Sequence, residues 1–232
     1  MLRYAVLVVI SLVSNSVFAQ QTSAPAASEE PAVASAQPEK AVVPMEEPQP
    51  GDHWTYEIKD EITGAITATR ENVVTEVTPT EISVRFKRLG NSEEGGLNVY
   101  DRSWNLVEAP HWRYSPNDGM GVRLPLVVGK SWPVQGNNVN NTSGATWKRS
   151  GTSKVVGQES IRTKAGTFDT FKIETTYVLK NVKDPTRDEE ITSQTWYAPA
   201  IDHWVKRVFA LRATKHLRTN TTLELVDYGR KQ

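Results

Sequence analysis

The sequence predicts an all-β fold, a large and strongly curved antiparallel sheet of the half-barrel or open-barrel type. Apolar and polar residues alternate with period two over most of residues 51–232. Outside the first nineteen residues, no window of ten or more positions carries an apolar stripe of helical period. Thr- and Val-rich segments are separated by turns rich in Gly, Pro and Asp. We therefore expect one all-β domain over residues 51–232.

The individual strands follow from the same alternation. Trp54, Tyr56 and Ile58 share one side of the first segment, and Phe171, Ile173, Tyr177 and Leu179 share one side of the clearest later segment. Residues 90–141 are less regular, with one hairpin expected over 98–107 and turn clusters at 115–119 and 136–138. We expect this middle region to form loops over one end of the sheet. Further strands are expected at 65–77, 82–87, 146–156, 189–197, 203–211 and 214–226.

The first nineteen residues have the features of a secretory signal peptide. Arg3 is followed by an almost unbroken apolar run over 4–13, and Val17-Phe18-Ala19 provides the small residues that a signal peptidase requires. The run of about ten residues is shorter than the roughly 20 that span a bilayer as a helix. Cleavage is expected after Ala19, giving a periplasmic or secreted protein that is not an integral membrane protein once the signal is removed.

Residues 20–50 have the composition of a disordered segment. They contain six prolines, seven alanines and no aromatic residue. Such a chain buries too little apolar surface to offset its conformational entropy, so we expect an extended Pro/Ala/Glu-rich linker. It is a solvated spacer, a segment that docks in a groove of a partner, or an arm that crosses the space of the cell wall.

Composition excludes several classes of chemistry. The chain has no cysteine, which excludes disulfides, cysteine zinc sites, thiol nucleophiles and a lipidated cysteine. Its 27 basic and 27 acidic residues give a formal charge of zero, which argues against a nucleic-acid partner. The sequence Val128-Gly129-Lys130-Ser131 resembles the end of a phosphate-binding loop, but Leu124 stands where the first glycine belongs. We expect no catalytic residues, no cofactor and no enzyme activity.

Three His-Trp pairs could together provide a metal site, because imidazole is a common metal ligand. They are His53-Trp54, His111-Trp112 and His203-Trp204. Adjacent residues of a strand point to opposite faces, so a tryptophan in the core places its neighbouring histidine outside. We therefore expect core tryptophans beside solvated histidines and no metal site.

Two groups of residues are candidates for binding. The aromatic group could line an apolar cavity or lie at a functional surface, because tryptophan offers a large apolar area with one polar atom; it consists of Trp112, Trp147, Trp204 and Phe209. The basic group is explained first as the solvated face of a pair of strands, and its alternative is contact with an anionic surface; it consists of Lys206, Arg207, Arg212, Lys215 and Arg218.

An ordered series of motifs resembles a group of uncharacterised bacterial secreted proteins with a domain of unknown function. The series runs from Pro125 to Tyr228 and includes Gly129-Lys130-Ser131-Trp132, Ala165-Gly166-Thr167-Phe168, Trp196-Tyr197-Ala198-Pro199 and Val205-Lys206. Members often have a Gly-rich segment before the Val-Lys pair, where this chain has residues 200–204. The resemblance implies a curved antiparallel sheet somewhat like the half-barrels of periplasmic lipoprotein carriers, and it supplies no catalytic residues.

Two functions follow from these observations. The first is a non-enzymatic envelope protein that binds an apolar or amphipathic, lipid-like ligand on the concave face of the sheet. The alternative is an interaction or scaffolding module of the cell envelope with a packed interior and no ligand cavity. A cavity of several hundred Å³ lined by apolar residues distinguishes the first from the second.

Overall fold

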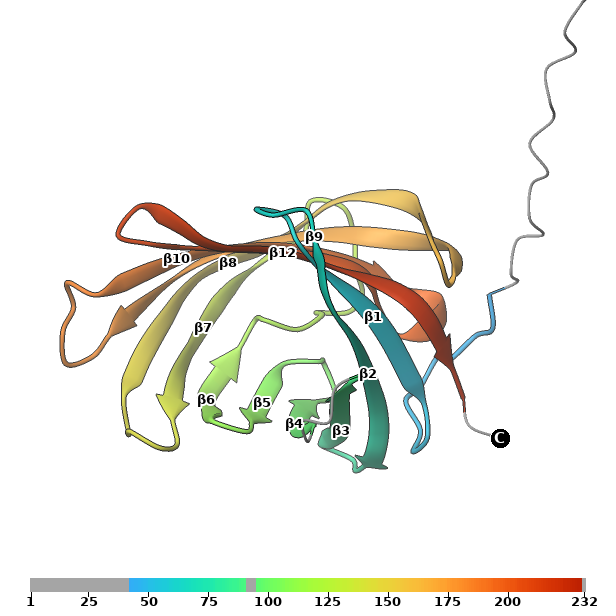
Figure 1. The fold of residues 1–232 in the computed structure, drawn as a ribbon, viewed down its shortest axis with the longest axis horizontal. Helices are drawn as coiled ribbons and strands as arrows, with labels where there is room; N and C mark the ends of the chain where they lie inside the picture. Colours follow the sequence, from blue (N-terminus) through green and yellow to red (C-terminus); the bar gives the residue numbers. More distant parts are fainter. Residues whose placement is uncertain (1–41, 91–94, 231–232) are drawn as a thin grey trace, which may run out of the picture. The chain divides into compact units, whose positions relative to one another are not determined.

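A computed structural model describes residues 42–90 and 95–230. Twelve strands lie in this part of the chain, and each pairs antiparallel with its neighbours until β12 returns to β1, so that the sheet closes into a barrel (Figure 1). The predicted all-β antiparallel sheet is confirmed, with a curvature that extends to closure. The strands are β1 (His53–Asp60), β2 (Ile66–Val77), β3 (Glu81–Arg88), β4 (Gly96–Asp101), β5 (Leu106–Ala109), β6 (Trp112–Asp118), β7 (Ser131–Asn140), β8 (Thr146–Thr163), β9 (Gly166–Asn181), β10 (Asp188–Ala198), β11 (His203–Ala213) and β12 (His216–Gly229).

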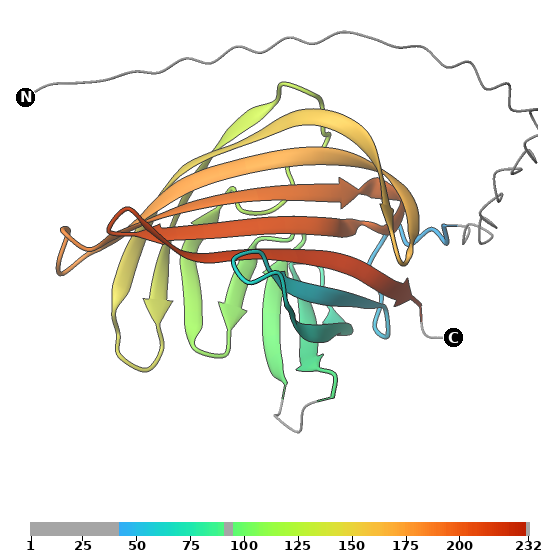
Figure 2. The same ribbon diagram turned by 45° about the horizontal axis from the view of Figure 1, so that its top comes forward.

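The period-two pattern determines which side chains fill the barrel. On β9, Ile173, Thr175, Tyr177 and Leu179 are buried at every second position, as a strand with one inner face requires. Five long strands, β8 to β12, lie side by side along one wall (Figure 2). Their length gives the barrel an interior deeper than its short strands β4 to β6 could provide alone.

The two ends of the barrel differ. One end, which we call the mouth, is formed by the turns at 61–65, 110–111, 141–145, 182–187 and 214–215. The opposite end is closed by the turns at 78–80, 102–105 and 164–165, by the short 3-10 helix η1 (Pro199–Ile201) and by residues 42–52. Because successive turns of an antiparallel meander alternate between ends, each end collects every second connection.

Residues 119–130, between β6 and β7, fold into the barrel instead of covering it from outside. Val122 and Leu126 pack in one buried cluster with Trp132 of β7 and Ile173 of β9. The indole of Trp132 donates a hydrogen bond to the carbonyl of Gly119 (3.0 Å), which fixes the start of the loop. Figure 1 shows this loop crossing the interior between the two walls. Val122 and Leu126 therefore contribute to the core in the closed half of the barrel.

The prediction that residues 90–141 form loops over one end of the sheet was wrong for most of that region. The hairpin expected over 98–107 exists as β4 and β5, but β6 and β7 add two more strands that complete the barrel wall. The turn-like residues 136–138 lie inside β7, where the Asn138 amide oxygen accepts a hydrogen bond from Arg149. The hydrogen bond from Arg149 to the Asn138 amide stabilises the extended conformation here, although asparagine generally favours turns.

The end of the segment predicted to be disordered packs on the barrel. Met45 is buried, and its backbone N–H donates to the carbonyl of Ala200 (2.8 Å). Asp52 is buried as well, and both its carboxylate oxygens accept hydrogen bonds from Arg230 at the end of β12. Residues 42–52 thus join the first strand to the last. The predicted signal peptide and residues 20–41 of the predicted linker lie outside the described residues.

The main buried cluster lies at the closed end. Trp54, Trp104 and Trp204 meet there, with Trp54 and Trp104 in an edge-to-face arrangement at 5.8 Å between ring centroids. Aromatic pairs of this kind contribute about 0.5–1.5 kcal/mol beyond the area that they bury. The aromatic residues therefore form a rigid floor beneath the interior.

His203 departs from the expected pattern, because it is buried beside the buried Trp204. The prediction of an outward histidine holds for His53, which is partly exposed next to the buried Trp54, and it fails for His203. The cause is a bulge: Trp196 pairs with Lys206 and Tyr197 with Trp204, so Val205 has no partner on β10. A bulge interrupts the alternation and places consecutive side chains on the inner side.

Candidate functional site

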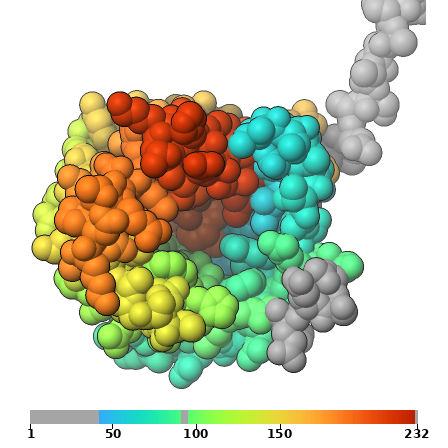
Figure 3. All heavy atoms as spheres, turned by 60° about the vertical axis from the view of Figure 1, so that its left-hand side comes forward, coloured from blue at the N-terminus to red at the C-terminus, as the bar shows by residue number. Residues whose placement is uncertain are grey.

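The mouth of the barrel is hollowed. Figure 3 looks into this end and shows a recess surrounded by the tips of the hairpins, with atoms of β11 at its floor. A barrel of eight strands is just filled by its own side chains, and a twelve-stranded barrel encloses a wider interior. Val122 and Leu126 of the loop 119–130 pack into the closed half of the interior, and the recess of Figure 3 lies at the mouth.

Three arginine side chains face this interior, Arg70 on β2, Arg149 on β8 and Arg207 on β11. We call these three residues and the space that they face the arginine lumen. The charges of Arg70 and Arg207 both act on the buried Tyr56 of β1. Arg70 is the register partner of Tyr56 on the neighbouring strand. Arg207 lies on β11, which β12 separates from β1, so it acts on the same tyrosine from another part of the inner wall.

Arg149 is held in a fixed position. Its Nη1 donates to Oδ1 of Asn117 (2.9 Å) and its Nη2 to Oδ1 of Asn138 (2.6 Å). The guanidinium carbon lies 5.4 Å from the ring centroid of Tyr114 and 5.5 Å from that of Tyr177. The side chain is 6% exposed, and its Nε has no hydrogen-bond partner among the described residues. Burial lowers the pKa of Arg149 and raises the pKa of both tyrosines.

Arg207 lies deeper, above the aromatic floor. Its guanidinium carbon is 3.9 Å from the ring centroid of Trp204, and its Nε donates to Oγ1 of Thr195 (3.1 Å). Burial lowers the pKa of Arg207, while the side chain keeps partial contact with solvent through the open side of the barrel. A guanidinium stacked on an aromatic face retains its N–H groups at the edges for a planar anion.

Carboxylates do not balance these charges. Among residues 42–90 and 95–230, no salt bridge reaches Arg70, Arg149 or Arg207. Glu189, at the mouth end of β10, acts on Tyr177 by its charge but forms no ion pair with these arginines in that part of the chain. The interior is therefore cationic, which is costly in a protein unless an anion compensates it.

The floor beneath Arg207 is almost completely filled. The cavity between Arg207, Trp104, Trp204 and Val122 has a volume of only about 10 Å³, about the space of one water molecule. His203 lies in this floor, with its ring centroid 4.2 Å from that of Trp54 and 3.7 Å from that of Trp204. The interior below Arg207 thus leaves no room for a ligand.

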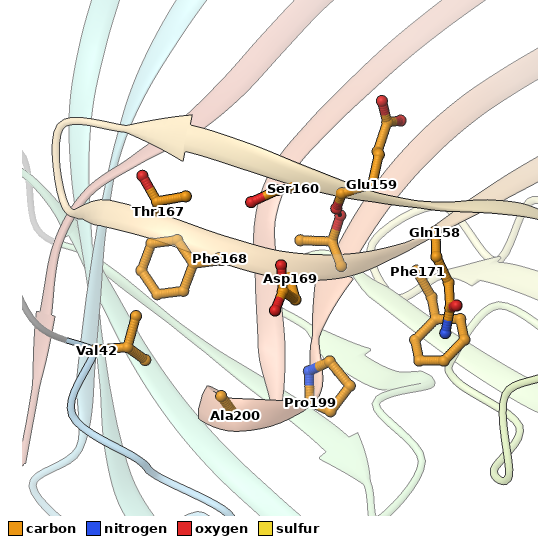
Figure 4. A pocket seen from close by; sticks show the side chains of 11 residues that line it. Val42, Gln158, Glu159, Ser160, Thr167, Phe168, Asp169, Phe171, Pro199 and Ala200 are labelled. Atoms are coloured by element: carbon orange, nitrogen blue, oxygen red, sulfur yellow. Dashed lines mark hydrogen bonds between the residues drawn. The ribbon is translucent and has the colours of Figure 1, made fainter.

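Another hollow lies on the outside of the barrel. A groove of about 790 Å³ lies between the β8–β9 extension and η1 (Figure 4). Phe168 and Phe171 of β9 contribute its apolar part, with Val42 beside Phe168, and Asp169 adds a carboxylate. The groove has a mixed lining and no unpaired buried charge, so its chemistry selects a ligand less clearly than the arginine lumen does.

The structure separates the four aromatic candidates. Trp147 and Phe209 are partly buried and pack against one apolar cluster of the interior, which contains Tyr177 and Leu179. Trp112 is partly buried at the start of β6, paired with Asn140 at the mouth end of β7. Trp204 is buried in the aromatic floor. The mouth thus brings together Trp147 and Phe209, while Trp204 supports Arg207 from below.

The basic candidates do not form one surface. Arg207 faces the interior, whereas Lys206 points to the opposite side of β11 and lies over the ring of Trp196 (5.4 Å). Arg212, Lys215 and Arg218 are exposed at the β11–β12 hairpin beside the mouth. Alternation along the strand separates the interior charge from the outer ones.

Sequence reasoning missed Arg70 and Arg149. The spacing along each strand could have indicated them. Arg149 lies six residues from Val155 on β8, and Arg70 lies four residues from Val74 on β2, so each arginine is on the same face of its strand as the valine. Both valines are buried, so the same inner face carries an arginine in each strand. A charged residue at an inward position is the feature that marks the site.

Residues 42–90 and 95–230 place no group of three or more His, Asp and Glu side chains where they could hold a metal ion. In the same part of the chain, no helix is long and apolar enough to span a membrane.

The chain is similar to one protein-family model and to solved structures of the same fold. The DUF3108-like family model matches residues 131–206, from β7 to the start of β11. No curated protein sequence shows a significant match to the chain. A candidate lipoprotein from Parabacteroides distasonis has the same fold, with a TM-score of 0.52, 14% identity, and coverage of 80% of this chain and 99% of its own.

A second solved structure gives the same result. A candidate exported protein with a YmcC-like fold from Bacteroides fragilis aligns with a TM-score of 0.53 and 13% identity, covering 82% of this chain and all of its own. The expected resemblance to an uncharacterised family with a domain of unknown function is thereby confirmed. The chain carries a DUF3108-like region over residues 131–206 within a barrel of the YmcC-like fold.

Proposed function

We propose that this chain is an exported, non-enzymatic binding protein that takes one end of an amphipathic molecule into the mouth of its barrel. Export is supported by the signal-like residues 1–19 and by the two proteins of similar fold, which are described as a lipoprotein candidate and an exported-protein candidate. The observation that carries the proposal is the hollowed mouth, where apolar side chains are only partly buried beside buried guanidinium groups.

The apolar part of the site lies on strands β8, β9 and β11 of one wall. Phe209 and Leu211 of β11, Leu179 of β9 and Trp147 of β8 pack in or against one cluster, and Phe209, Leu211 and Trp147 remain partly exposed. From Arg207 to Leu211 this wall is about 13 Å long at roughly 3.3 Å per residue. Such a wall accommodates a short length of hydrocarbon chain and leaves the rest of a long molecule outside.

The free energy of burying a hydrocarbon chain on the apolar wall is too small to give useful affinity by itself. Burying six methylene groups contributes roughly 5 kcal/mol at about 0.8 kcal/mol each. Association costs at least about 4 kcal/mol in lost translational and rotational freedom. Useful affinity therefore requires interactions with the polar end of the ligand as well.

Binding of the neutral dye N-phenyl-1-naphthylamine tests the apolar part. We expect its fluorescence to rise on addition of the mature protein and to fall when decanoate displaces it. Phe209→Ser should weaken dye binding, and Val208→Ser should not, because Val208 occupies the opposite face of the same strand and lines an outer hollow. Equal effects of the two substitutions, or no dye binding at all, would defeat the proposal.

An interaction module is the second candidate function. The outer groove beside Val42, Phe168 and Pro199 favours it, since a groove of this size accommodates an extended peptide. Its test is Phe168→Ser in a search for partners by cross-linking in periplasmic extract. Loss of a specific cross-linked partner, together with unchanged dye binding, would favour the module over the ligand carrier.

A further inference from the structure

The arginine lumen contains three cations that the described part of the barrel leaves without a carboxylate. Arg149 and Arg70 each bury an Nε that has no hydrogen-bond partner in those residues. Arg207 has one described hydrogen bond, from its Nε to Thr195, so its Nη groups stay available. Buried polar groups in proteins are almost always satisfied, and each exception calls for an explanation.

A structural role does not explain the cluster. A core of the same shape with methionine or leucine at these positions would avoid the cost of placing like charges in one interior. Arg70 and Arg207 act on each other unfavourably, since the charge of Arg70 lowers the pKa of Arg207. Arg149 is also held by two asparagines and two tyrosine rings. Holding an arginine so firmly prepares it for an anion from elsewhere.

We propose that the arginine lumen binds the anionic headgroup, a carboxylate or a phosphate, of an amphiphile whose hydrocarbon chain runs along Phe209 and Leu211 to the mouth. This inference rests on the proposed function and names the ligand class for the same site. Guanidinium groups match carboxylate and phosphate in geometry and give short, charge-assisted hydrogen bonds.

The direction of the ligand follows from the order of residues along β11. Arg207 is the deepest, Phe209 is next and Leu211 is nearest to the mouth. The space below Arg207 is about 10 Å³, too small for a headgroup. The headgroup therefore goes no deeper than Arg207, with Arg149 nearer to the mouth, and the chain points outward.

Calorimetric titration of the mature protein tests this inference with four probes at concentrations below micelle formation: decanoate, decyl phosphate, decanol and inorganic phosphate. We expect both amphiphilic anions to bind at least about tenfold more tightly than decanol, since a hydrogen bond to a charged group contributes about a factor of ten or more. Inorganic phosphate should bind more weakly than decyl phosphate, because it lacks the chain.

Arg149→Gln and Arg207→Gln should each weaken binding of the anions about tenfold or more and leave decanol binding unchanged. Arg212→Gln is the matched control, since Arg212 lies on the same strand as Arg207 and is exposed. If a glutamine variant fails to fold, Arg149→Lys and Arg207→Lys replace it. They keep the charge and lose the planar fork, and we expect them to weaken the anions by a smaller factor.

The outcomes separate the two proposals. Equal affinity for decanoate and decanol, with no effect of the arginine variants, overturns the anionic headgroup and leaves the amphiphile-binding function standing. Inorganic phosphate that binds as tightly as decyl phosphate overturns the role of the chain. Failure of all four probes to bind overturns both proposals.

Discussion

The buried Asp52 provides a stringent test of how the closed end holds together. Its side chain is inaccessible to solvent, and its carboxylate accepts hydrogen bonds from Arg230 Nε (2.8 Å), Arg230 Nη2 (3.0 Å) and the N–H of Gln49 (2.8 Å). Arg230 also donates to the carbonyl of Glu47 (2.7 Å). These contacts attach the entry into β1 to the end of β12, where the barrel closes.

The substitution Asp52→Ala removes three hydrogen bonds at once. A bond to a charged group contributes about 1.5–3 kcal/mol, but the Arg230 side chain is 35% exposed and regains solvation, so the lower end applies to its two bonds. The Gln49 N–H loses its partner as well. Together these effects predict a loss of about 3 kcal/mol in the free energy of unfolding, which lowers Tm by roughly 6–12 °C in a domain of this size.

Thermal denaturation of the mature protein, followed by tryptophan fluorescence, measures this loss. Glu57→Ala is the control, because Glu57 pairs with Lys164 at 2.7 Å in an exposed position and such pairs contribute at most about 1 kcal/mol. Asp52→Asn keeps the shape without the charge and should fall between the two. The reasoning is refuted if Asp52→Ala lowers Tm by no more than Glu57→Ala does.

Two further substitutions test the interior. Burial lowers the pKa of His203 well below its ordinary value, with Arg207 adding to the effect, so only the unfolded chain gains a proton near pH 6.5. This contribution to stability is complete above about pH 6.5 and falls by about 1.4 kcal/mol per pH unit below it. Urea unfolding between pH 7 and 5 should show that the free energy of unfolding declines less steeply for His203→Phe than for wild type. His216→Phe, at an exposed site, is the control and should match wild type. Gly121→Ala should lower the free energy of unfolding by about 1–3 kcal/mol, because a Cβ there would lie 1.9 Å from the Ser103 carbonyl oxygen. Gly157→Ala, with open space around it, should have little effect. Equal Tm values for the two variants would contradict the inward packing of residues 119–130.

The alternation of apolar and polar residues was sufficient to predict the inner residues of the long strands. On β9 the predicted inner residues Ile173, Tyr177 and Leu179 are all buried, since one face of a strand faces the core and the alternation records it. The pattern failed at His203, where a bulge and the left-handed Asp202 place consecutive residues inside. It also failed around Asn138. The asparagines there indicated a turn, but the Asn138 side chain accepts a hydrogen bond from the interior Arg149 within a strand.

The sequence by itself determined that the chain is an all-β protein with one inward face per strand and no cysteine chemistry, because these properties depend on residue type and spacing alone. Only the tertiary structure decided which residues meet. Arg70, Arg149 and Arg207 are far apart in the chain, and they share one interior because β12 returns to β1 and closes the sheet. Closure is a property of pairing between distant strands, and this pairing brings separate inward arginines into one interior.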